Sequence, residues 1–591
     1  MEVYFQIITD SKALTGACNE FETEEILGFD TETTELDPFD GILRLVQLSN
    51  GKNTIVIDLK PFAEKGDLKT MPELEPLRKL LSAKIPMKAA HNAKFDAKWI
   101  AHHLGVELGG AFDTFLASQL ISAGDRDRRH NLAEVTNYFL GTELDKSEQV
   151  SDWGADELSQ SQVEYAAKDA ATMVPLREKI VEKLKADGLM SVAQIEFDCV
   201  TPIALMELNG FYLDASRWKK QLEKVKKEQD RIWLELQGML AAGVAQASLF
   251  GAPEINLNSQ AQVSDALRNL GVPLPETTRG WQLQPLAEDY PVIDKLLEYR
   301  SVAKSLTSFG DNILEFIRPE TGRIHADFRQ IGAPTGRFSC SKPNLQQIPH
   351  DAEYRRCFRA EEGNKLIIAD YSQIELRILA EFSGDENFIN AFKSGEDFHA
   401  SAAAQVFGVD PKDVTPDQRT FAKRLNFGVV YGIGSQRFAM MTGVSQRDAE
   451  DILRKYFTTY RGLDEWLRSA AKRAKEERMA RTASGRMARF RFDENEPQEV
   501  ASVQRYGKNM PIQGTSADIL KIALHLLNEE FRGTSARLVN IVHDEIVVEV
   551  NETEAQETAV KLEKAMIDAA ERFVKKVPIK VDLDISDDWV K

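Results

Sequence analysis

Two carboxylates follow the apolar run of residues 26–29, where Asp30 and Glu32 are separated by one threonine. Because the side chains of a strand alternate between its two faces, both acids are expected on one face at the end of a strand. Carboxylates held so close repel each other unless a cation compensates. Mg²⁺ takes hard oxygen ligands of this kind and leaves positions free for substrate phosphates. The pair therefore predicts a metal site for phosphate chemistry, with an exposed surface turn as the alternative.

More acidic residues recur along the chain in a set order. An HNAKFD segment ends in Asp96, an FDT segment surrounds Asp113, and a YAAKD segment runs from Tyr165 to Asp169. Tyr165 and Asp169 are four residues apart, so they share one face of a helix. In order and spacing, this series resembles the three motifs of the DEDDy superfamily of 3′ to 5′ proofreading exonucleases.

The exonuclease resemblance implies a role for each of these side chains. Asp30, Glu32, Asp96 and Asp169 would bind two metal ions, and Tyr165 would orient the attacking water. The reaction would be an in-line displacement, in which the metals stabilise the attacking and the leaving oxygen. All four acids are present, so the resemblance implies an active nuclease.

A second set of acids lies in the C-terminal half. Asp370 follows the apolar run of residues 366–369, which predicts that it stands at a strand end. Far along the chain, residues 543–545 (HDE) stand between two β-rich apolar runs, residues 536–542 and 546–550. This arrangement predicts a hairpin whose tight turn presents acidic side chains. An exposed polar turn without a function is the alternative.

A helical stripe lies between the two acidic segments. Arg419, Lys423, Phe427 and Tyr431 recur every fourth residue and therefore share one helix face. Arg binds phosphate as a fork and Lys as a point charge, while aromatic rings offer stacking faces for bases. The stripe thus suits a triphosphate followed by a flat base, with an ordinary amphipathic helix as the alternative.

Together, the segments of the C-terminal half resemble motifs A, B and C of the family A DNA polymerases, the bacterial polymerase I class. The resemblance extends from about Glu196 to the C-terminus, so with the exonuclease motifs it covers nearly the whole chain. Four further matching segments are residues 335–339 (TGRFS), 343–349 (PNLQQIP), 397–399 (DFH) and 509–515 (NMPIQGT).

The polymerase resemblance implies roles for a larger group of residues. Asp370 and Asp544 would hold two Mg²⁺ ions, which Mn²⁺ can replace, with Tyr371 as a further ligand and Glu545 nearby. The residues implied in nucleotide binding are Arg419, Lys423, Phe427, Tyr431, His399, Gln373 and Glu375. Those implied in contacts with primer and template are Arg337, Asn344, Gln347, Arg505, Asn509, Gln513, His543, Arg300 and Lys304.

Three of these residues would determine chemistry or selectivity. Lys423 would donate a proton to the leaving pyrophosphate. Glu375 would close off the space at the sugar 2′ position, which would make ribonucleotides poor substrates. A phenylalanine at position 427, where tyrosine is the alternative, would discriminate against dideoxynucleotides.

The pattern of elements predicts a multidomain chain of α/β and α+β parts. Three short β-rich runs, residues 26–29, 43–48 and 54–57, alternate with helical stretches up to residue 190, and long polar helices follow. Beyond Gly336 strands mix with long helices, among them residues 462–479 and 552–576. The resemblance implies a ribonuclease H-like exonuclease domain and then a right-hand polymerase. The expected bounds are 1–190 for the exonuclease, 191–591 for the polymerase, about 205–335 for the thumb, 336–385 with 506–591 for the palm, and 386–505 for the fingers.

The composition of the chain limits the functions that these motifs predict. The chain has 591 residues, 43% of them hydrophobic, and a net charge of -19, which taken alone argues against a polyanionic partner. The charge is uneven, because residues 418–447 and 478–491 each hold five basic residues and no acidic one. The four cysteines lie far apart without metal-ligand spacing, which predicts buried free thiols and a reducing compartment.

The same features predict the setting of the protein. No apolar run is long enough for a membrane span, and the N-terminus resembles no signal or transit peptide. We expect a monomer in the cytoplasm of a bacterium or a phage-infected cell, or in an organelle after removal of a transit peptide. Its partners would be primer-template DNA and dNTPs, with a replisome helicase or primase as further candidates. The absence of a 5′ nuclease segment before the exonuclease argues against removal of RNA primers.

The sequence leaves three rival functions open. The chain fits a stand-alone nuclease whose C-terminal part only binds nucleic acid, a single-subunit RNA polymerase, or a scaffold. The intact set of Asp370, Arg419, Lys423 and Asp544 disfavours the first, and Glu375 together with the proofreading motifs disfavours the second. A scaffold would have no need of two sets of metal-type acids.

Overall fold

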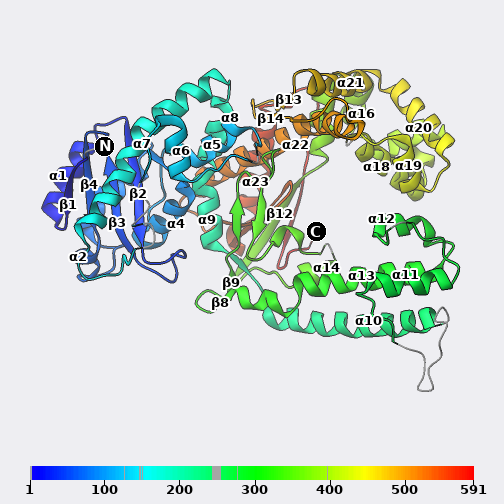
Figure 1. Ribbon diagram of the computed structural model, residues 1–591, viewed down its shortest axis with the longest axis horizontal. Helices are drawn as coiled ribbons and strands as arrows, with labels where there is room; N and C mark the ends of the chain where they lie inside the picture. Colours follow the sequence, from blue (N-terminus) through cyan, green and yellow to red (C-terminus); the bar gives the residue numbers. More distant parts are fainter. Residues whose placement is uncertain are drawn as a thin grey trace.

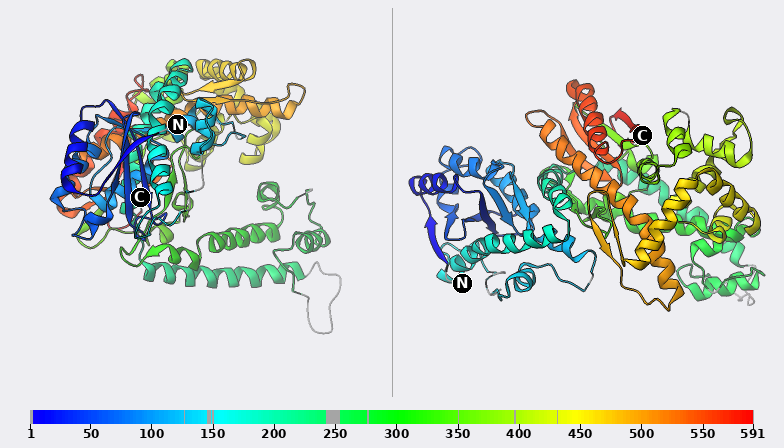
Figure 2. Two further views of the ribbon diagram at one scale, coloured as in Figure 1. Left: turned by 60° about the vertical axis from the view of Figure 1, so that its left-hand side comes forward. Right: turned by 90° about the horizontal axis from the view of Figure 1, so that it is seen from above.

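The computed structural model describes residues 3–125, 127–144, 148, 151–241, 254–275, 277–349, 351–395, 397–430 and 432–590. An N-terminal α/β unit forms one end of an elongated molecule, and the remaining elements surround a second sheet (Figure 1). Seen from above, the N-terminal unit stands clearly apart from the rest (Figure 2). No helix among the described residues is long and apolar enough to cross a membrane.

The N-terminal unit is built on a six-stranded sheet with the order β1-β4-β3-β2-β5-β6. Its strands are β1 (Tyr4–Ile8), β2 (Ile26–Thr33), β3 (Leu43–Ser49), β4 (Asn53–Asp58), β5 (Met87–Ala90) and β6 (Ala111–Asp113). β3 runs antiparallel to both of its neighbours, whereas the other pairs are parallel. The three β-rich runs predicted for this region are confirmed. β2 is longer than expected, so Asp30 and Glu32 lie inside the strand.

Helices cover this sheet and lead out of the unit. They are α1 (Ser11–Phe21), α2 (Lys60–Ala63), α3 (Glu75–Ser82), α4 (Ala93–Leu104), α5 (Thr114–Ser122), α6 (Leu132–Leu140) and α7 (Gln160–Ala186). The long helix α7 begins at a capping box, in which Ser159 and Gln162 bond to each other's backbone N–H groups. It packs across β2, β3 and β4.

A helical arm follows the N-terminal unit. Its connection consists of α8 (Met190–Asp198), α9 (Val200–Asn209) and β7 (Phe211–Tyr212), and the arm consists of α10 (Ala215–Ala241), α11 (Gln260–Asn269), α12 (Gly280–Leu283) and α13 (Pro291–Phe309). α10 packs along α13, and the arm buries its own small apolar core. It projects from the body as an extended pair of helices (Figures 1 and 2).

The central sheet has the order β15-β16-β12-β17, with every neighbouring pair antiparallel. Its strands are β12 (Asn364–Tyr371), β15 (Arg537–Val542), β16 (Glu545–Asn551) and β17 (Val581–Ser586). α23 (Ala555–Ala570) packs on this sheet, and α9 packs on β15. α14 (Ala352–Arg355), α15 (Ile374–Ser383) and α22 (Pro497–Glu530) belong to the same part of the chain. Short strands link the sheet to the arm: β8 (Ile317–Arg318), β9 (Arg323–Ile324), β10 (Asp327–Arg329) and β11 (Ser339–Ser341).

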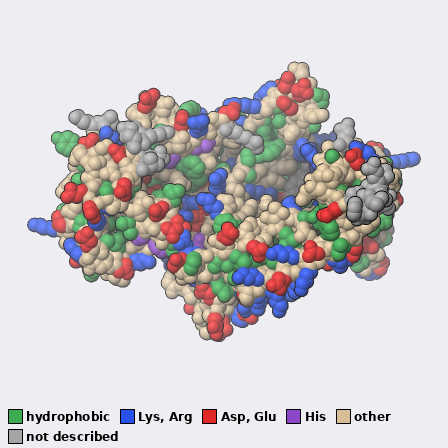
Figure 3. Space-filling view, turned by 60° about the horizontal axis from the view of Figure 1, so that its bottom comes forward, with side chains coloured by type: hydrophobic (Ala, Val, Ile, Leu, Met, Phe, Trp, Pro, Cys, Tyr) green, Lys and Arg blue, Asp and Glu red, His purple; other side chains and the backbone are tan. Residues whose placement is uncertain are grey.

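A third group of helices lies opposite the arm (Figure 1). It comprises α16 (Glu386–Lys393), α17 (Phe398–Phe407), α18 (Pro416–Val430), α19 (Ser435–Thr442), α20 (Gln446–Thr459), α21 (Arg461–Glu476) and the hairpin of β13 (Met479–Arg481) and β14 (Met487–Arg489). In a space-filling view the surface is hollowed between the lobes, and Lys and Arg side chains show there (Figure 3).

Two predicted helices have wrong ends. The helix predicted for residues 462–479 ends at Glu476, because Met479 already pairs in the β13–β14 hairpin. The helix predicted for residues 552–576 is an α-helix only over Ala555–Ala570. Residues 552–554 form a 3₁₀ turn that Asn551 caps.

The two large apolar cores do not divide at residue 190. Val192, Ala193 and Val200 of α8 and α9 belong to the core of the N-terminal unit, whereas Ile195 of α8 and Cys199 between the two helices belong to the core of the central sheet. These two helices therefore join the units through packed side chains. All four cysteines are buried free thiols, as predicted.

Candidate active sites

The first carboxylate site consists of Asp30, Glu32, Asp96 and Asp169. β2 carries Asp30 and Glu32, α4 carries Asp96, and α7 carries Asp169. β2 is central in its sheet and α7 packs across it, so residues far apart in the sequence meet at one place. Asp96 and Asp169 are buried, while Asp30 and Glu32 are half-buried. The structure thus brings together the four acids that the sequence singled out.

Burial and mutual repulsion perturb all four acids. The pKa values of Asp30 and Glu32 lie well above their ordinary range, first because of desolvation and then because of the neighbouring carboxylates. Burial raises the pKa of Asp96 to about 7 and that of Asp169 to about 7, although each accepts a hydrogen bond. The Thr31 hydroxyl donates to Asp96 at 2.6 Å. No ion pair with Lys or Arg relieves the repulsion within the described part of the chain.

This set of oxygen donors fits a divalent cation in its chemistry. Hard carboxylate ligands with uncompensated negative charge are what Mg²⁺ requires. As the side chains stand, however, no three His, Cys, Asp or Glu residues among those described converge as a ready-made metal site. A bound cation would neutralise part of the charge that makes these carboxylates repel one another.

Tyr165 stands beside this group on α7. Its phenol hydrogen-bonds Asp169, and burial together with the nearby carboxylates raises the pKa of the phenol. Tyr165 therefore stays neutral and can donate a hydrogen bond. Asp113, in the FDT segment, has a structural role, because its carboxylate accepts backbone N–H bonds at the starts of both α4 and α5.

The second carboxylate site consists of Asp370 and Asp544. Asp370 is the penultimate residue of β12 and lies directly opposite Glu545 of β16. His543 and Asp544 form the two-residue turn between β15 and β16, as the sequence predicted, with His543 at a φ of 58°. These residues line a pocket of about 370 Å³ together with Arg355.

Electrostatics at this site resemble those at the first. Burial raises the pKa of Asp544 to about 7, and the charges of Asp370 and Glu375 act in the same direction. Two acids at the end of a sheet, each destabilised by the other, fit a divalent cation as oxygen donors. The side chain of Tyr371 points into the core, where its hydroxyl donates to Met566 O at 2.6 Å. Tyr371 can therefore offer the site only its backbone carbonyl.

Glu545 differs from the two acids beside it. Its carboxylate accepts a hydrogen bond of 2.8 Å from the Trp589 indole and pairs with Arg355 at 3.5 Å. The Arg355 guanidinium in turn lies 4.3 Å from the Trp589 ring centroid. Glu545 is thus held by Trp589 and Arg355. This supports a position next to the metal ligands and not a role as a ligand itself.

Arg337 and Glu375 form an ion pair with each other next to the second site. Glu375 is buried in the first turn of α15, and Arg337 is partly exposed. Gln373, immediately before α15, has a φ of 58° and a buried side-chain oxygen without a hydrogen-bond partner in the described part of the chain. An unpaired buried acceptor is costly and is expected to receive a donor from a ligand.

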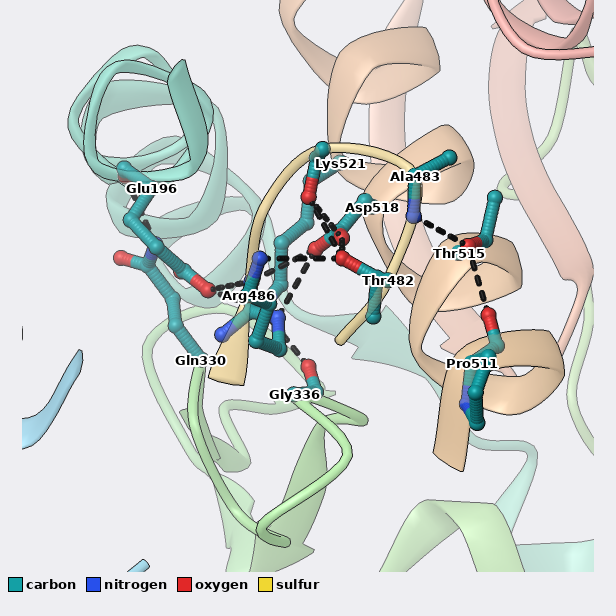
Figure 4. A network of polar contacts seen from close by, with 11 residues as sticks. Glu196, Gln330, Gly336, Thr482, Ala483, Arg486, Pro511, Thr515, Asp518 and Lys521 are labelled. Atoms are coloured by element: carbon teal, nitrogen blue, oxygen red, sulfur yellow. Dashed lines mark hydrogen bonds and ion pairs between the residues drawn. The ribbon is translucent and has the colours of Figure 1, made fainter. Parts of the chain in front are cut away.

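A buried ionic cluster beneath Arg337 was missed from the sequence (Figure 4). Lys521 on α22 lies 2.5 Å from Glu196 of α8 and donates to the Gly336 carbonyl at 2.7 Å. Arg486 of the β13–β14 hairpin pairs with both Glu196 and Asp518. All four charged side chains are at most 2% exposed. The cluster ties α8, α22 and the hairpin to the turn that precedes Arg337.

The surroundings of Gly336 require a glycine at this position of the turn. Gly336 has a φ of +83°, and a Cβ there would meet Arg486 Nε at 2.4 Å. The signal in the sequence was a pair of charges, Asp518 and Lys521, inside an otherwise apolar helical run of residues 516–524. Charged residues in such a run are almost never fully buried unless they are paired.

The predicted basic and aromatic stripe lies on α18. Lys423 is exposed, Phe427 is half-buried with its ring centroid 5.9 Å from that of His399, and Arg419 pairs with Asp397 at 2.6 Å. Tyr431 lies outside the described residues. The stripe is thus confirmed as a helical face up to Phe427.

His399 is more enclosed than the other predicted nucleotide contacts. Its side chain is buried, and Nδ1 lies 2.9 Å from the Asn426 amide nitrogen. Burial lowers the pKa of His399 to about 4, so the ring is neutral near pH 7. A hydrogen bond from Nε2 is therefore the contact it can offer a phosphate, without a charge.

Some of the predicted contacts with primer and template lie on α22, and others lie in turns. Arg505, Asn509 and Gln513 lie four residues apart on α22, with Arg505 exposed and the other two half-buried. The Asn509 side-chain oxygen is buried without a partner in the described part of the chain. His543 and Gln347 are exposed, and Asn344 caps the 3₁₀ turn that contains Gln347.

Two predicted contacts lie on the arm helix α13, away from the central sheet. Arg300 donates to the Thr278 carbonyl at 2.6 Å, so part of its guanidinium stabilises the arm itself. Lys304 is exposed. For both residues, contact with nucleic acid stays a prediction.

Comparisons with known proteins agree with this geometry. Residues 224–591 match the family described as DNA polymerase family A, and residues 5–185 match the family described as 3′-5′ exonuclease. The chain is 33% identical to the DNA polymerase I of Aquifex aeolicus, with 99% of this chain and 100% of that protein covered. It is 32% identical to the DNA polymerase I of Pseudomonas aeruginosa, of which it spans 66%.

A solved structure is similar over the same length. The POL domain of Pol1 from M. smegmatis, in complex with DNA primer-template and dNTP, superposes with a TM-score of 0.84 at 26% identity and covers 99% of both chains. Family matches over both halves, and a relative of one-third identity aligned from end to end, show that the chain belongs to DNA polymerase family A and carries a 3′-5′ exonuclease domain.

Proposed function

We propose that this chain adds dNTPs to a primer 3′-OH under the direction of a template and removes 3′-terminal nucleotides at a separate site. The observation that carries the proposal is the presence of two groups of mutually repelling carboxylates on two different sheets. Each group suits a divalent cation, and each lies among the residues that match the corresponding family.

At the second carboxylate site, Asp370 and Asp544 are the proposed ligands of two Mg²⁺ ions, with the Tyr371 carbonyl as a third donor and Mn²⁺ as a substitute. When bound, such ions lower the pKa of the primer 3′-OH and neutralise charge on the pyrophosphate. Glu545 stays paired with Arg355 and supports the turn that presents Asp544.

The incoming nucleotide lies against α18 in this proposal. Arg419 and Lys423 hold the phosphates, and Lys423, exposed and charged, donates the proton that the pyrophosphate takes up. Phe427 packs on the sugar and base, with Tyr431 as its proposed partner on the template side. His399 contributes a neutral hydrogen bond.

Selectivity depends on the group beside α15. Glu375, held by Arg337, fills the space beneath the sugar 2′ position and rejects ribonucleotides. Gln373 supplies its unpaired side-chain oxygen to the incoming substrate. A phenylalanine at 427 leaves no hydroxyl to replace a missing 3′-OH, which disfavours dideoxynucleotides.

The duplex is read through its minor groove, where acceptors occupy similar places in every correct pair. Arg337, Asn509, Gln513 and His543 are the proposed contacts there. Further contacts, mainly with the backbone, are proposed for Asn344, Gln347, Arg505, Arg300 and Lys304.

At the first carboxylate site, Asp30, Glu32, Asp96 and Asp169 bind two divalent cations that stabilise the attacking and leaving oxygens of an in-line displacement. Tyr165, neutral and bonded to Asp169, donates to the attacking water and orients it. Removal of a mispaired 3′ nucleotide is proofreading.

The division into parts follows the same proposal. The exonuclease comprises residues 1–190, the thumb about 205–335, the palm 336–385 and 506–591, and the fingers 386–505. The arm of α10 and α13 and the α16–α21 group then hold the duplex and the nucleotide from opposite sides of the central sheet. The proposed setting is replication or repair in a bacterial or phage-infected cell, with a helicase or primase as candidate partners.

The test is an assay of the purified chain with Mg²⁺ and a labelled primer-template. We expect extension with four dNTPs and shortening of the primer without them. Degradation without extension would indicate a stand-alone nuclease, and incorporation of rNTPs as efficient as that of dNTPs would indicate an RNA polymerase. DNA binding without either reaction would indicate a scaffold, and each of these three outcomes would contradict the proposal.

A further inference from the structure

The loop of residues 34–42 joins the strand that carries Asp30 and Glu32 to β3. Its tip is held by a residue outside the N-terminal unit. Arg318 of β8 donates to both carboxylate oxygens of Asp40, at 2.6 and 3.0 Å, and to Asp37 at 2.6 Å. Its guanidinium carbon lies 4.8 Å from the Phe39 ring centroid.

This contact is stronger than an ordinary surface ion pair. The Arg318 side chain is only 16% exposed, and it binds Asp40 through two parallel hydrogen bonds while it contacts an aromatic ring. Bidentate geometry fixes orientation as well as distance, which a single Lys contact does not. Arg318 therefore determines where the tip of the loop lies relative to β8.

A second anchor holds the helix that carries Asp96. Lys94 and Lys98 stand one turn apart on α4, and both form ion pairs with Glu207 of α9. Lys94 donates a hydrogen bond to one carboxylate oxygen at 2.5 Å, and the Lys98 ammonium lies 2.9 Å from the other. Lys94 also pairs with Asp327 of β10 at 2.7 Å. The Glu207 side chain is 2% exposed, so this contact is shielded from water and salt.

Both anchors come from residues 200–329. One ends on the loop that follows β2, and the other ends on α4, which carries Asp96. Positions of catalytic groups tolerate little error, since a displacement of about 1 Å can cost roughly a hundredfold in rate. Asp30 and Glu32 lie on β2 and Asp96 lies on α4, so the geometry of the first site depends on how these two elements are placed. Neither anchor contacts Asp370 or Asp544.

We propose that Arg318 and Glu207 are positioning residues of the exonuclease, through which the polymerase part of the chain sets the geometry of the first carboxylate site. The inference rests on the proposed exonuclease function. It gives β8 and α9, which lie outside the exonuclease domain, a role in the exonuclease reaction.

The test compares Arg318→Ala and Arg318→Lys with the unchanged chain. The kcat and KM for degradation of a single-stranded oligonucleotide from its 3′ end are measured beside primer extension and the melting temperature. We expect Arg318→Ala to lower the exonuclease kcat roughly tenfold and Arg318→Lys to recover part of it. Primer extension and the melting temperature should stay at the level of the unchanged chain.

Two further variants separate positioning from general loss of contact between the domains. Arg532→Ala breaks another ion pair to the N-terminal unit, with Glu107 in the segment between α4 and β6, and should leave the exonuclease kcat unchanged. Asp40→Ala should lower kcat, and the double variant with Arg318→Ala should be no slower than the slower single variant, because both changes remove one contact.

The outcomes are distinct. An exonuclease kcat of Arg318→Ala equal to that of the unchanged chain would overturn the inference and leave the proposed function standing. An equal loss in Arg532→Ala, or a parallel loss of primer extension, would also overturn it, because it would show a general effect of domain contact. No 3′ degradation by the unchanged chain would overturn both.

Discussion

At the scale of single residues, both sites keep acids together at a cost in stability. Asp30 and Glu32 are desolvated and repelled by Asp96 and Asp169, and no basic side chain among the described residues pairs with them. A protein under selection for stability alone would place amides or apolar residues here. The arrangement makes sense when divalent cations neutralise the charge.

The repulsion predicts a stability that depends on pH. The folded-state pKa values of these acids are raised. Their contribution to the free energy of unfolding is therefore most favourable below about pH 4 and is lost as the pH rises toward and through about 7. In EDTA at pH 8, the variant with Asp30→Asn and Glu32→Gln should melt about 5 °C above the unchanged chain. The difference should shrink at pH 5.

Thermal unfolding with and without Mg²⁺ checks this expectation. Mg²⁺ should raise the melting temperature of the unchanged chain and have a smaller effect on the amide variant, which has lost two charged ligands. An amide variant that is less stable than the unchanged chain in EDTA at pH 8 would show that the four acids do not repel each other.

At the scale of elements, the sequence predicted those parts in which residue types follow a short, regular spacing along the chain. β2, β12 and the turn between β15 and β16 were found because acids follow apolar runs, and α18 because its contacts recur every fourth residue. Contacts between distant segments have no such period. The bond from Arg318 to Asp40 and the ionic cluster around Arg486 join residues hundreds of positions apart or on unrelated elements, so only the fold reveals them.

The cluster around Arg486 predicts a large loss of stability when its balance is broken. Arg486→Met would leave the carboxylates of Glu196 and Asp518 buried with Lys521 as their remaining cation. We expect the free energy of unfolding to fall by about 3 kcal/mol. Urea unfolding followed by tryptophan fluorescence measures this change.

A matched control is Arg231→Met on α10. Arg231 pairs with Glu228 and Glu235 at the surface of the arm, so its loss should change the free energy of unfolding far less than the loss of Arg486 does. If both variants lost the same amount, the buried cluster would have no special role in joining α8, α22 and the hairpin.

At the scale of the whole molecule, the net charge of -19 conceals a local excess of the opposite sign. The acid-free run of residues 418–447 covers most of α18 and all of α19, and the run of residues 478–491 covers the β13–β14 hairpin. Part of the acid excess lies in the two proposed metal sites, and part pairs with basic residues across the domain interface, as at Arg318. DNA should therefore bind in one region and be repelled elsewhere.

Salt dependence tests this distribution. Arg505 is exposed on α22 and is a proposed phosphate contact, so Arg505→Ala should reduce the slope of log affinity against log salt by about one. Fluorescence anisotropy with a primer-template at several salt concentrations measures the slope. Lys79→Ala, at an exposed site on α3 of the N-terminal unit, should leave it unchanged, and equal effects of both changes would contradict a confined binding region.

The central claim is that one chain holds two independent sites, one for synthesis and one for degradation. The most direct measurement is an assay of both activities on a single preparation of Asp544→Ala, whose melting temperature is first shown to match that of the unchanged chain. Loss of primer extension with full 3′ degradation is the predicted result. Retained extension, or equal loss of both activities in the folded variant, would contradict the claim.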